Sequence, residues 1–307
     1  MAKSLIKTIY KSSRWCKLLL VLIILLIFFI GSKASFNIKE GFINQTEKFK
    51  MIDGPKLYDG FYSKIYDDLV FDKVKNEYEV GEIINSTQPT LKSLILDVGS
   101  GTGDHVAKFT EKNLKAVGLD SSPAMVTVAK QKYPNLDFTL GDATNVMIYP
   151  AHTFTHITCL NFTLYYIQDK YLFFRNCYEW LKPGGYLVIH LVDRNRFDPV
   201  LNSVDPISGL KIKKYANESA TTSIINFNDY QYKAQFGLNK PNNTAVYEET
   251  FTDSNNKSRK QIHRLYMPEI KTILQEAKNA GFVVQSKLDL APVEYEYQYL
   301  YVLYKPE

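Results

Sequence analysis

The sequence has few cysteines, and their spacing suggests neither a covalent framework nor a metal site. Cys16, Cys159 and Cys177 are the three cysteines among 307 residues. They lie far apart, so the paired spacing of zinc and redox motifs is absent, and three cysteines cannot all pair with one another. We therefore expect no metal site, and interpret Cys159 and Cys177 as buried thiols. With 45% apolar residues, the chain is expected to bury a sizeable core instead.

Beyond its N-terminus the chain also lacks an excess of charge. The formal net charge is +5, but residues 1–17 carry five basic residues and no acidic one. Removing these five from the 37 basic residues leaves 32, equal to the 32 acidic residues. A neutral remainder gives no support for a nucleic-acid-binding surface, so no nucleic-acid partner is expected.

Two common phosphate-binding patterns are missing as well. The sequence has no G-x-x-x-x-G-K-[ST] run, which argues against a nucleotide triphosphatase. Its one glycine-rich turn has Asp104 where the dinucleotide fingerprint G-x-G-x-x-G requires glycine. Pyrophosphate binding at that turn is therefore disfavoured.

One long apolar run is present, directly behind the basic N-terminal segment. No charged residue lies between Lys17 and Lys33. A helix over residues 18–32 would rise about 22 Å, less than a hydrocarbon core of about 30 Å. Snorkelling lysines and Trp15 at the interface would extend that reach. We predict a transmembrane signal-anchor segment at 18–32, followed by a polar linker at 33–50.

From Leu91 onward, short apolar runs alternate with helical patterns, which predicts βαβ units and a parallel sheet covered on both faces. The expected strands are Leu94–Val98, Ala116–Leu119, Asp137–Leu140, His156–Leu160, Tyr186–Leu191, Phe282–Lys287 and a last strand near Tyr295–Tyr304. The expected helices are His105–Lys112, Pro123–Lys132, Lys170–Leu181 and Pro268–Ala280. Residues 194–266 follow a different pattern of polar loops and alternating runs, and are predicted to form an antiparallel insertion.

The strongest motif is Leu94-Ile-Leu-Asp-Val-Gly-Ser-Gly-Thr-Gly103, an apolar strand that runs into a glycine-rich turn before a helix. Such glycines permit positive φ and close approach of the backbone to a ligand. The run closely resembles the first motif of class I, Rossmann-like S-adenosylmethionine (SAM) dependent methyltransferases, and the resemblance continues over residues 58–304. It implies a seven-stranded, mostly parallel sheet with an antiparallel last strand, and SAM as cofactor. Asp97, Gly99, Gly101 and Gly103 would contact the methionine part of SAM.

Later segments resemble the remaining cofactor motifs of that family. After the second strand, Asp120 and Ser121 match the ribose-binding position, although Asp120 could instead cap the next helix. After the third strand, Asp142 and Ala143 match the adenine-binding position. The resemblance places Met125 on the adenine, with ordinary core packing as its alternative, and Asn161 beside the sulfonium.

The acceptor site is less well defined by the sequence. Tyr58 to Val70 carry apolar residues at helical spacing and are similar to the leading helix of small-molecule methyltransferases, where aromatic hydroxyls close over SAM. Tyr58 and Tyr66 are therefore candidates for SAM and acceptor contacts, with plain packing as the alternative. Among the five histidines, His152 and His263 lie in loop or insertion sequence and are weak candidates for a base.

These observations predict an enzyme that transfers a methyl group from SAM to a small polar acceptor, such as an amine or amino sugar. The insertion at 194–266 would cap the acceptor pocket of a methyltransferase domain at 51–307. A lipid or quinone methyltransferase and a non-catalytic SAM-binding scaffold are the alternatives. Oligomeric state has no signal in the sequence.

The N-terminal segment has two interpretations. Ser32, Lys33 and Ala34 would suit cleavage of a signal peptide. We favour an uncleaved single-pass anchor with the catalytic domain in the cytosol, because SAM is made there and the cysteines cannot all pair. Basic residues on the two sides of the span nearly balance, so the positive-inside rule leaves the orientation open.

Overall fold

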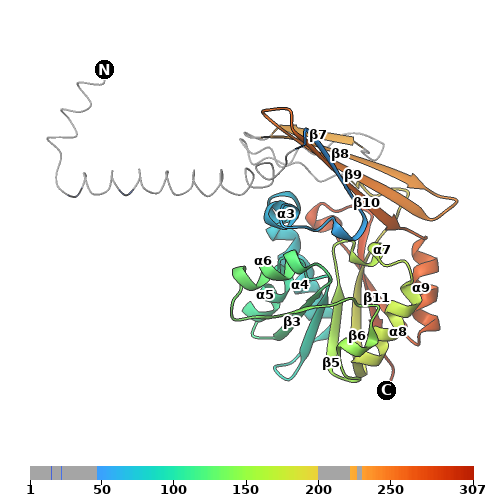
Figure 1. Ribbon diagram of the computed structural model, residues 1–307. Helices are drawn as coiled ribbons and strands as arrows, with labels where there is room; N and C mark the ends of the chain where they lie inside the picture. The colour runs from blue at the N-terminus through green and yellow to red at the C-terminus, as the bar shows by residue number, and fades with distance from the viewer. Residues whose placement is uncertain (1–14, 16–21, 23–46, 200–221, 227–229) are drawn as a thin grey trace. The chain divides into compact units, whose positions relative to one another are not determined.

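A computed structural model describes residues 15, 22, 47–199, 222–226 and 230–307 (Figure 1). The chain divides into two compact units, residues 1–46 and 47–307, and the fold of the second is described below. The predicted anchor at 18–32 lies outside the described residues except for Leu22. No helix among the described residues is long and apolar enough to cross a membrane. The anchor therefore stays a prediction.

A seven-stranded sheet forms the centre of the second unit, in the order β11-β12-β6-β5-β2-β3-β4. Strands β2 to β6 are parallel to one another, whereas β12 is antiparallel to both β6 and β11. This confirms the predicted Rossmann-like sheet with its antiparallel last strand. The bounds are β2 (Leu94–Val98), β3 (Lys115–Asp120), β4 (Asp137–Leu140), β5 (Phe154–Cys159), β6 (Leu181–Val192), β11 (Val283–Asp289) and β12 (Gln298–Tyr304).

Helices cover both faces of this sheet because its central strands are apolar on both sides. Figure 1 shows α4, α5 and α6 on one side and α8 and α9 on the other. Asp169 starts α8 by accepting a 2.8 Å hydrogen bond from the Leu172 N–H, and Gly281, at φ +107°, follows the end of α9. The bounds are α4 (Lys73–Thr87), α5 (Asp104–Glu111), α6 (Pro123–Lys132), α8 (Lys170–Trp180) and α9 (Ile270–Asn279).

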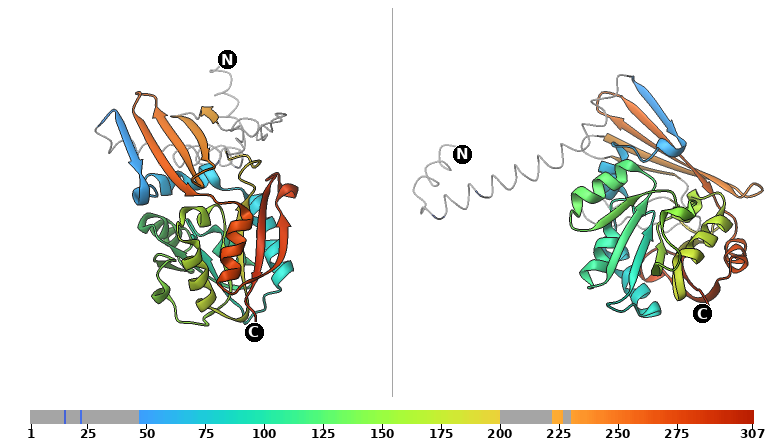
Figure 2. Two further views of the ribbon diagram at one scale, coloured as in Figure 1. Left: turned by 90° about the vertical axis from the view of Figure 1, so that its right-hand side faces the viewer. Right: turned by 60° about the horizontal axis from the view of Figure 1, so that its bottom comes forward.

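A second sheet of five strands contains the predicted insertion, in the order β1-β10-β9-β8-β7. Its four insertion strands are antiparallel, as expected. The fifth strand, β1 (Phe49–Asp53), comes from the segment before α3 and pairs in parallel with β10 (Figure 2). The predicted linker at 33–50 is therefore too long by two residues, since Phe49 and Lys50 belong to the sheet. The insertion strands are β7 (Thr222–Asn226), β8 (Tyr230–Asn239), β9 (Thr244–Asp253) and β10 (Ser258–Tyr266).

The leading segment differs from its prediction in two ways. Helix α3 runs from Tyr62 to Val70, so Tyr58 lies before it rather than in its first turn. Asp59 accounts for the later start, because its Oδ1 accepts 3.1 Å hydrogen bonds from the N–H groups of Phe61 and Tyr62. The sequence analysis also missed α4, which Asp72 caps through the N–H groups of Val74 and Lys75.

The described cysteines are both free and buried, which confirms the interpretation of Cys159 and Cys177 as buried thiols. Cys16 lies outside the described residues. Burial raises the pKa of both thiols, so they stay protonated at neutral pH.

Candidate active site

The candidate site lies where the parallel strands β2, β3, β4 and β5 end. Carboxyl ends of parallel strands meet at one edge of a sheet, and ligands bind there in open α/β folds. A cavity of about 960 Å³ opens at this edge. The following candidates from the sequence line it: Tyr58, Tyr66, Gly99, Gly101, Asp120, Ser121, Met125, Asp142, Ala143, Asn161 and His263.

The glycine-rich turn after β2 has a conformation that only glycine adopts without strain. Gly99 and Gly101 have φ of +71° and +55°. A Cβ on Gly99 would lie 2.3 Å from Cγ2 of Thr163, a contact that would force the neighbouring segment to move. The turn therefore forms a cradle that a side chain would fill, next to the N-terminus of α5.

Asp97 ends β2 as a buried carboxylate. Its side chain is 2% exposed, and Oδ1 accepts a 2.7 Å hydrogen bond from the Thr158 hydroxyl. Burial raises the pKa of Asp97 to about 6, although His105 nearby acts to lower it. Within the described part of the chain Asp97 forms no ion pair, which fits a site for the ammonium group of a methionine moiety.

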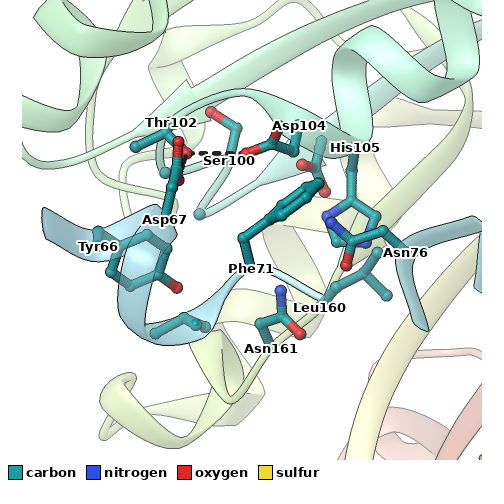
Figure 3. Close-up of a pocket in the computed structure, with 14 residues that line it drawn as sticks. Tyr66, Asp67, Phe71, Asn76, Ser100, Thr102, Asp104, His105, Leu160 and Asn161 are labelled. Atoms are coloured by element: carbon teal, nitrogen blue, oxygen red, sulfur yellow. Dashed lines mark hydrogen bonds between the residues drawn. The ribbon is translucent and has the colours of Figure 1, made fainter. Parts of the chain in front are cut away.

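Asp97 also lines a smaller pocket of about 40 Å³ beside the main cavity. Figure 3 shows residues around it from α3 (Tyr66, Asp67), from the glycine turn (Ser100, Thr102) and from the segment after β5 (Asn161). Tyr66 and Asn161 line both spaces. The small pocket therefore adjoins the main cavity.

Asp120 ends β3 and is tied to the turn after β2. Its Oδ2 accepts a 2.9 Å hydrogen bond from the Gly101 N–H, and its Oδ1 accepts a 2.8 Å bond from the Ser122 N–H. The alternative of a helix cap is wrong, because the N-cap of α6 is Ser122, which accepts from the Met125 N–H. Each carboxylate oxygen can accept one more hydrogen bond, so together they could bind the two hydroxyls of a diol in the cavity.

The adenine-side candidates lie together after β4. Asp142 Oδ1 accepts 2.9 Å hydrogen bonds from the N–H and the hydroxyl of Thr144, which leaves Oδ2 toward solvent or ligand. Met125 is 1% exposed and lies in the cavity wall. Met125 is therefore packed in the core, and its contact with adenine stays a prediction.

Asn161 has an unusual backbone and a charged partner. Asn161 and Phe162 have φ of +46° and +64°, a conformation that non-glycine residues rarely adopt. Lys75 Nζ donates a 2.5 Å hydrogen bond to Asn161 Oδ1 and lies 2.7 Å from Glu79 Oε1. Sequence reasoning missed this network, although the four-residue spacing of Lys75 and Glu79 was a signal for it.

Aromatic side chains surround the end of the cavity under the second sheet. The Tyr58 ring lies 6.1 Å from that of Tyr66 and 5.8 Å from that of Tyr166, both edge to face. Burial raises the pKa of all three hydroxyls, so each stays protonated at neutral pH. Tyr166 sits on α7 (Thr163–Tyr166), which contacts β10.

His263 is the predicted base candidate that reaches this cluster. Its Nδ1 lies 2.6 Å from the Tyr166 hydroxyl and its Nε2 lies 2.7 Å from Oε2 of Glu249. Sequence reasoning singled out neither Tyr166 nor Glu249. The three residues lie on different elements, and 97 residues separate Tyr166 from His263.

Two other candidates do not reach the cavity lining. His152 precedes β5, at the opposite edge of the sheet, where it is exposed and its N–H bonds to the Glu179 carbonyl. Gly103 has φ +90°, and a Cβ there would lie 2.6 Å from the Phe138 ring. Gly103 therefore serves close packing instead of ligand contact, and His152 is too distant for a base.

The remaining histidines are core residues. His156 and His190 are buried in strands, and burial lowers the pKa of each to about 4. His105 is buried as well and lies 3.0 Å from Glu79 Oε2.

Comparison with known proteins agrees with this geometry. Residues 95–185 match a family model described as a methyltransferase domain. This part of the chain is similar to methyltransferase domains. Over 114 residues the chain is 35% identical to dTDP-4-amino-2,3,4,6-tetradeoxy-D-glucose N,N-dimethyltransferase of Saccharopolyspora spinosa, covering 36% of this chain and 45% of that protein. It is also 35% identical over 104 residues to demethylmenaquinone methyltransferase of Chlorobaculum tepidum, covering 33% of this chain and 42% of that protein.

The matched part of the chain thus spans less than half the length of these curated relatives. Solved structures show a similar fold over a larger part of the chain. A SAM-dependent methyltransferase from Clostridium acetobutylicum superposes with a TM-score of 0.61 at 16% identity, covering 80% of this chain and 98% of that one. A SAM-bound amino pentose methyltransferase from Micromonospora echinaspora superposes with a TM-score of 0.56 at 18% identity. This match covers 76% of this chain and 90% of that one. Family and fold together support SAM as the cofactor.

Proposed function

We propose that the chain transfers a methyl group from SAM to a small polar acceptor. The observation that carries this proposal is the placement of three acids at neighbouring strand ends: Asp120 and Asp142 line the main cavity, and Asp97 lines the small pocket that shares Gly99 and Gly101 with it. SAM supplies an activated methyl group when bound. Little covalent help is then needed from the protein, because positioning alone can contribute about 7–11 kcal/mol to such a reaction.

Different residues would bind different parts of the cofactor. Asp97 would bind the ammonium group of the methionine moiety, and the glycine turn would pass beneath that moiety. Asp120 would accept hydrogen bonds from the ribose hydroxyls, and Asp142 with Ala143 would bind the adenine edge. Tyr58 and Tyr66 would close the cavity over the cofactor.

A polar acceptor is supported by the cavity wall beyond these residues. His263 and Arg264 from β10 and Asp169 from the start of α8 bring ionisable groups to it. An amino-sugar methyltransferase is among the relatives, which supports an amine or amino sugar. Quinone methyltransferases are also among them, so a lipid or quinone acceptor remains the second candidate.

A non-catalytic scaffold is the third interpretation. The three acids and the glycine turn are intact and lie together, which supports retained cofactor binding. Catalysis is separated from binding by assaying the full chain with labelled SAM against amines, amino sugars and quinols.

Titration calorimetry with SAM tests the proposal directly. The full chain should bind SAM, and Asp120→Ala should weaken the affinity at least tenfold. Asp137→Ala is the matched control, because Asp137 is an exposed acid at the opposite end of the neighbouring strand. The proposal fails if SAM does not bind, or if Asp120→Ala and Asp137→Ala bind equally well.

We also propose that residues 18–32 anchor the enzyme to a membrane, with the domain in the cytosol. The apolar run between Lys17 and Lys33 supports this. Protease protection in sealed vesicles tests both points. Full digestion of the domain from the cytosolic side is expected, and protection from that side would overturn the orientation.

A further inference from the structure

A continuous chain of hydrogen bonds leads from the cavity into the second sheet. The Tyr166 hydroxyl contacts His263 Nδ1 at 2.6 Å, and His263 Nε2 contacts Glu249 Oε2 at 2.7 Å. Beyond Glu249, its Oε1 accepts a 2.6 Å hydrogen bond from the Tyr232 hydroxyl, which in turn contacts that of Tyr247 at 2.9 Å. Tyr166 and His263 line the cavity, whereas Glu249 lies behind them and is 1% exposed.

Glu249 lies at the inner end, and its carboxylate oxygens act as acceptors, since Oε1 accepts from the Tyr232 hydroxyl. With Oε2 accepting in the same way, His263 carries its proton on Nε2. His263 Nδ1 is then the lone-pair nitrogen, and it accepts the hydroxyl proton of Tyr166. This is the arrangement in which a carboxylate orients an imidazole and stabilises the imidazolium that forms when the imidazole takes a proton.

The surroundings favour a positive charge at this end of the cavity. The side chains that face His263 are Tyr58, Tyr62, Tyr166 and Tyr247, with Glu249 behind. Burial raises the pKa of these tyrosines, so they are neutral. The buried cation Arg259 on the same strand is paired with Asp59 at 2.7 Å. The charge of Arg259 is therefore already balanced. Glu249 and the tyrosine rings stay available to this end of the cavity, and a carboxylate and an aromatic ring both attract cations.

We propose that Tyr166, His263 and Glu249 form a proton relay and that the methyl acceptor is a primary or secondary ammonium group. The ammonium would bind among the rings beside Tyr166. Its proton passes to the Tyr166 oxygen while the Tyr166 proton passes to His263 Nδ1. Tyr166 is the catalytic residue in contact with the acceptor, His263 stores the proton, and Glu249 is a positioning residue. This inference rests on the proposed methyl transfer and adds its acceptor class.

The step balances in protons and electrons. The neutral amine that remains uses its lone pair to form the new nitrogen–carbon bond, and the carbon–sulfur bond breaks with its electron pair going to sulfur. The acceptor nitrogen thereby regains a positive charge. His263 returns its proton to solvent when the product leaves, so no oxidant, reductant or further reactant is required.

A spectroscopic test needs no acceptor. In the full chain labelled with ¹⁵N, the ring nitrogens of His263 should report the Nε2–H tautomer at pH 7.5, with Nδ1 unprotonated. His263→Gln assigns the signals by removing them. Glu249→Gln should convert the single tautomer into a mixture, since the carboxylate no longer selects it. An Nδ1–H tautomer in the unaltered protein would overturn the relay.

A kinetic test uses a panel of amino sugars and simple amines, each beside its fully N-methylated counterpart, with labelled SAM. Primary and secondary amines should accept methyl groups, whereas the quaternary counterparts should not. Tyr166→Phe and His263→Gln should lower kcat about 100-fold or more, the usual scale for losing a general base. Glu249→Gln should move the rising limb of the pH–rate profile to lower pH, because the imidazolium loses its counter-charge.

Matched controls separate chemistry from packing. Tyr165→Phe removes the neighbouring hydroxyl, which accepts a 2.9 Å bond from the Val192 N–H, and His156→Gln removes a buried core histidine. Neither should change the pH–rate profile. Calorimetry with S-adenosylhomocysteine shows whether each variant still binds the cofactor site. Intact binding with methylation of hydroxyl compounds alone, or with Tyr166→Phe fully active, would overturn the relay while leaving the proposed methyl transfer standing.

Discussion

The N–H of Gly101 donates a 2.9 Å hydrogen bond to Oδ2 of Asp120. This bond joins the turn after β2 to the end of β3, so the turn that we propose holds the methionine moiety and the acid that we propose binds the ribose form one unit. A change in the glycine turn should therefore affect the whole cofactor site.

Gly99→Ala should abolish SAM binding and destabilise the fold. Gly99 has φ +71°, and the new Cβ would lie 2.3 Å from Thr163. Backbone strain of this kind costs about 1–3 kcal/mol before the steric clash is added. Calorimetry and urea denaturation measure the two effects. Gly237→Ala is the control, because nothing lies within 4 Å of its Cβ position. Equal SAM affinity in the two variants would contradict the cradle.

SAM affinity should weaken as the pH falls through about 6. Burial raises the pKa of Asp97 to about 6, so acid removes the anion that would bind the SAM ammonium. The stability of the ligand-free protein should change in the opposite sense. A carboxyl with a raised pKa binds more protons when folded, so this group favours folding more at pH 5 than at pH 7.

Calorimetry and denaturation from pH 5 to 8 measure both trends. Thr158→Val removes the 2.7 Å hydrogen bond that acts to lower the pKa of Asp97. In that variant the loss of affinity should begin at a higher pH. An affinity that stays constant over this range would show that Asp97 does not hold the ammonium group.

Asp59→Ala should destabilise the protein by about 2–4 kcal/mol, because it leaves the buried Arg259 without its partner. It also removes the acceptor for the N–H groups at the start of α3. Asp53→Ala is the matched control. It breaks an ion pair to Arg264, whose side chain is 59% exposed, and should cost much less stability because solvent screens the pair. If urea denaturation shows an equal loss of unfolding free energy in the two variants, burial of Arg259 does not strengthen the Asp59–Arg259 pair.

Much of the fold and cofactor site could be predicted from the sequence because their signals are local. Asp97 and Asp120 each follow an apolar strand and precede a turn, so position along the chain indicates position at the sheet edge. Helix α4 was missed because its sequence is largely polar and contains Gly81, which blurs the helical pattern.

The acceptor end could not be predicted in the same way. Strand β1 pairs with β10 more than two hundred residues later, and only that pairing defines it as a strand. Glu249 and His263 lie on adjacent strands of the same sheet, and their contact depends on its register. Tyr166 joins them only because α7 packs against β10. Such contacts follow from tertiary packing, which no local pattern encodes.

The most direct test of the central claim is transfer of the labelled SAM methyl group by the full chain to a panel of primary amines and amino sugars. The account predicts a labelled N-methyl product and an equal amount of S-adenosylhomocysteine, both lost in Asp120→Ala and kept in Asp137→Ala. SAM binding with no S-adenosylhomocysteine formed from any acceptor would contradict it.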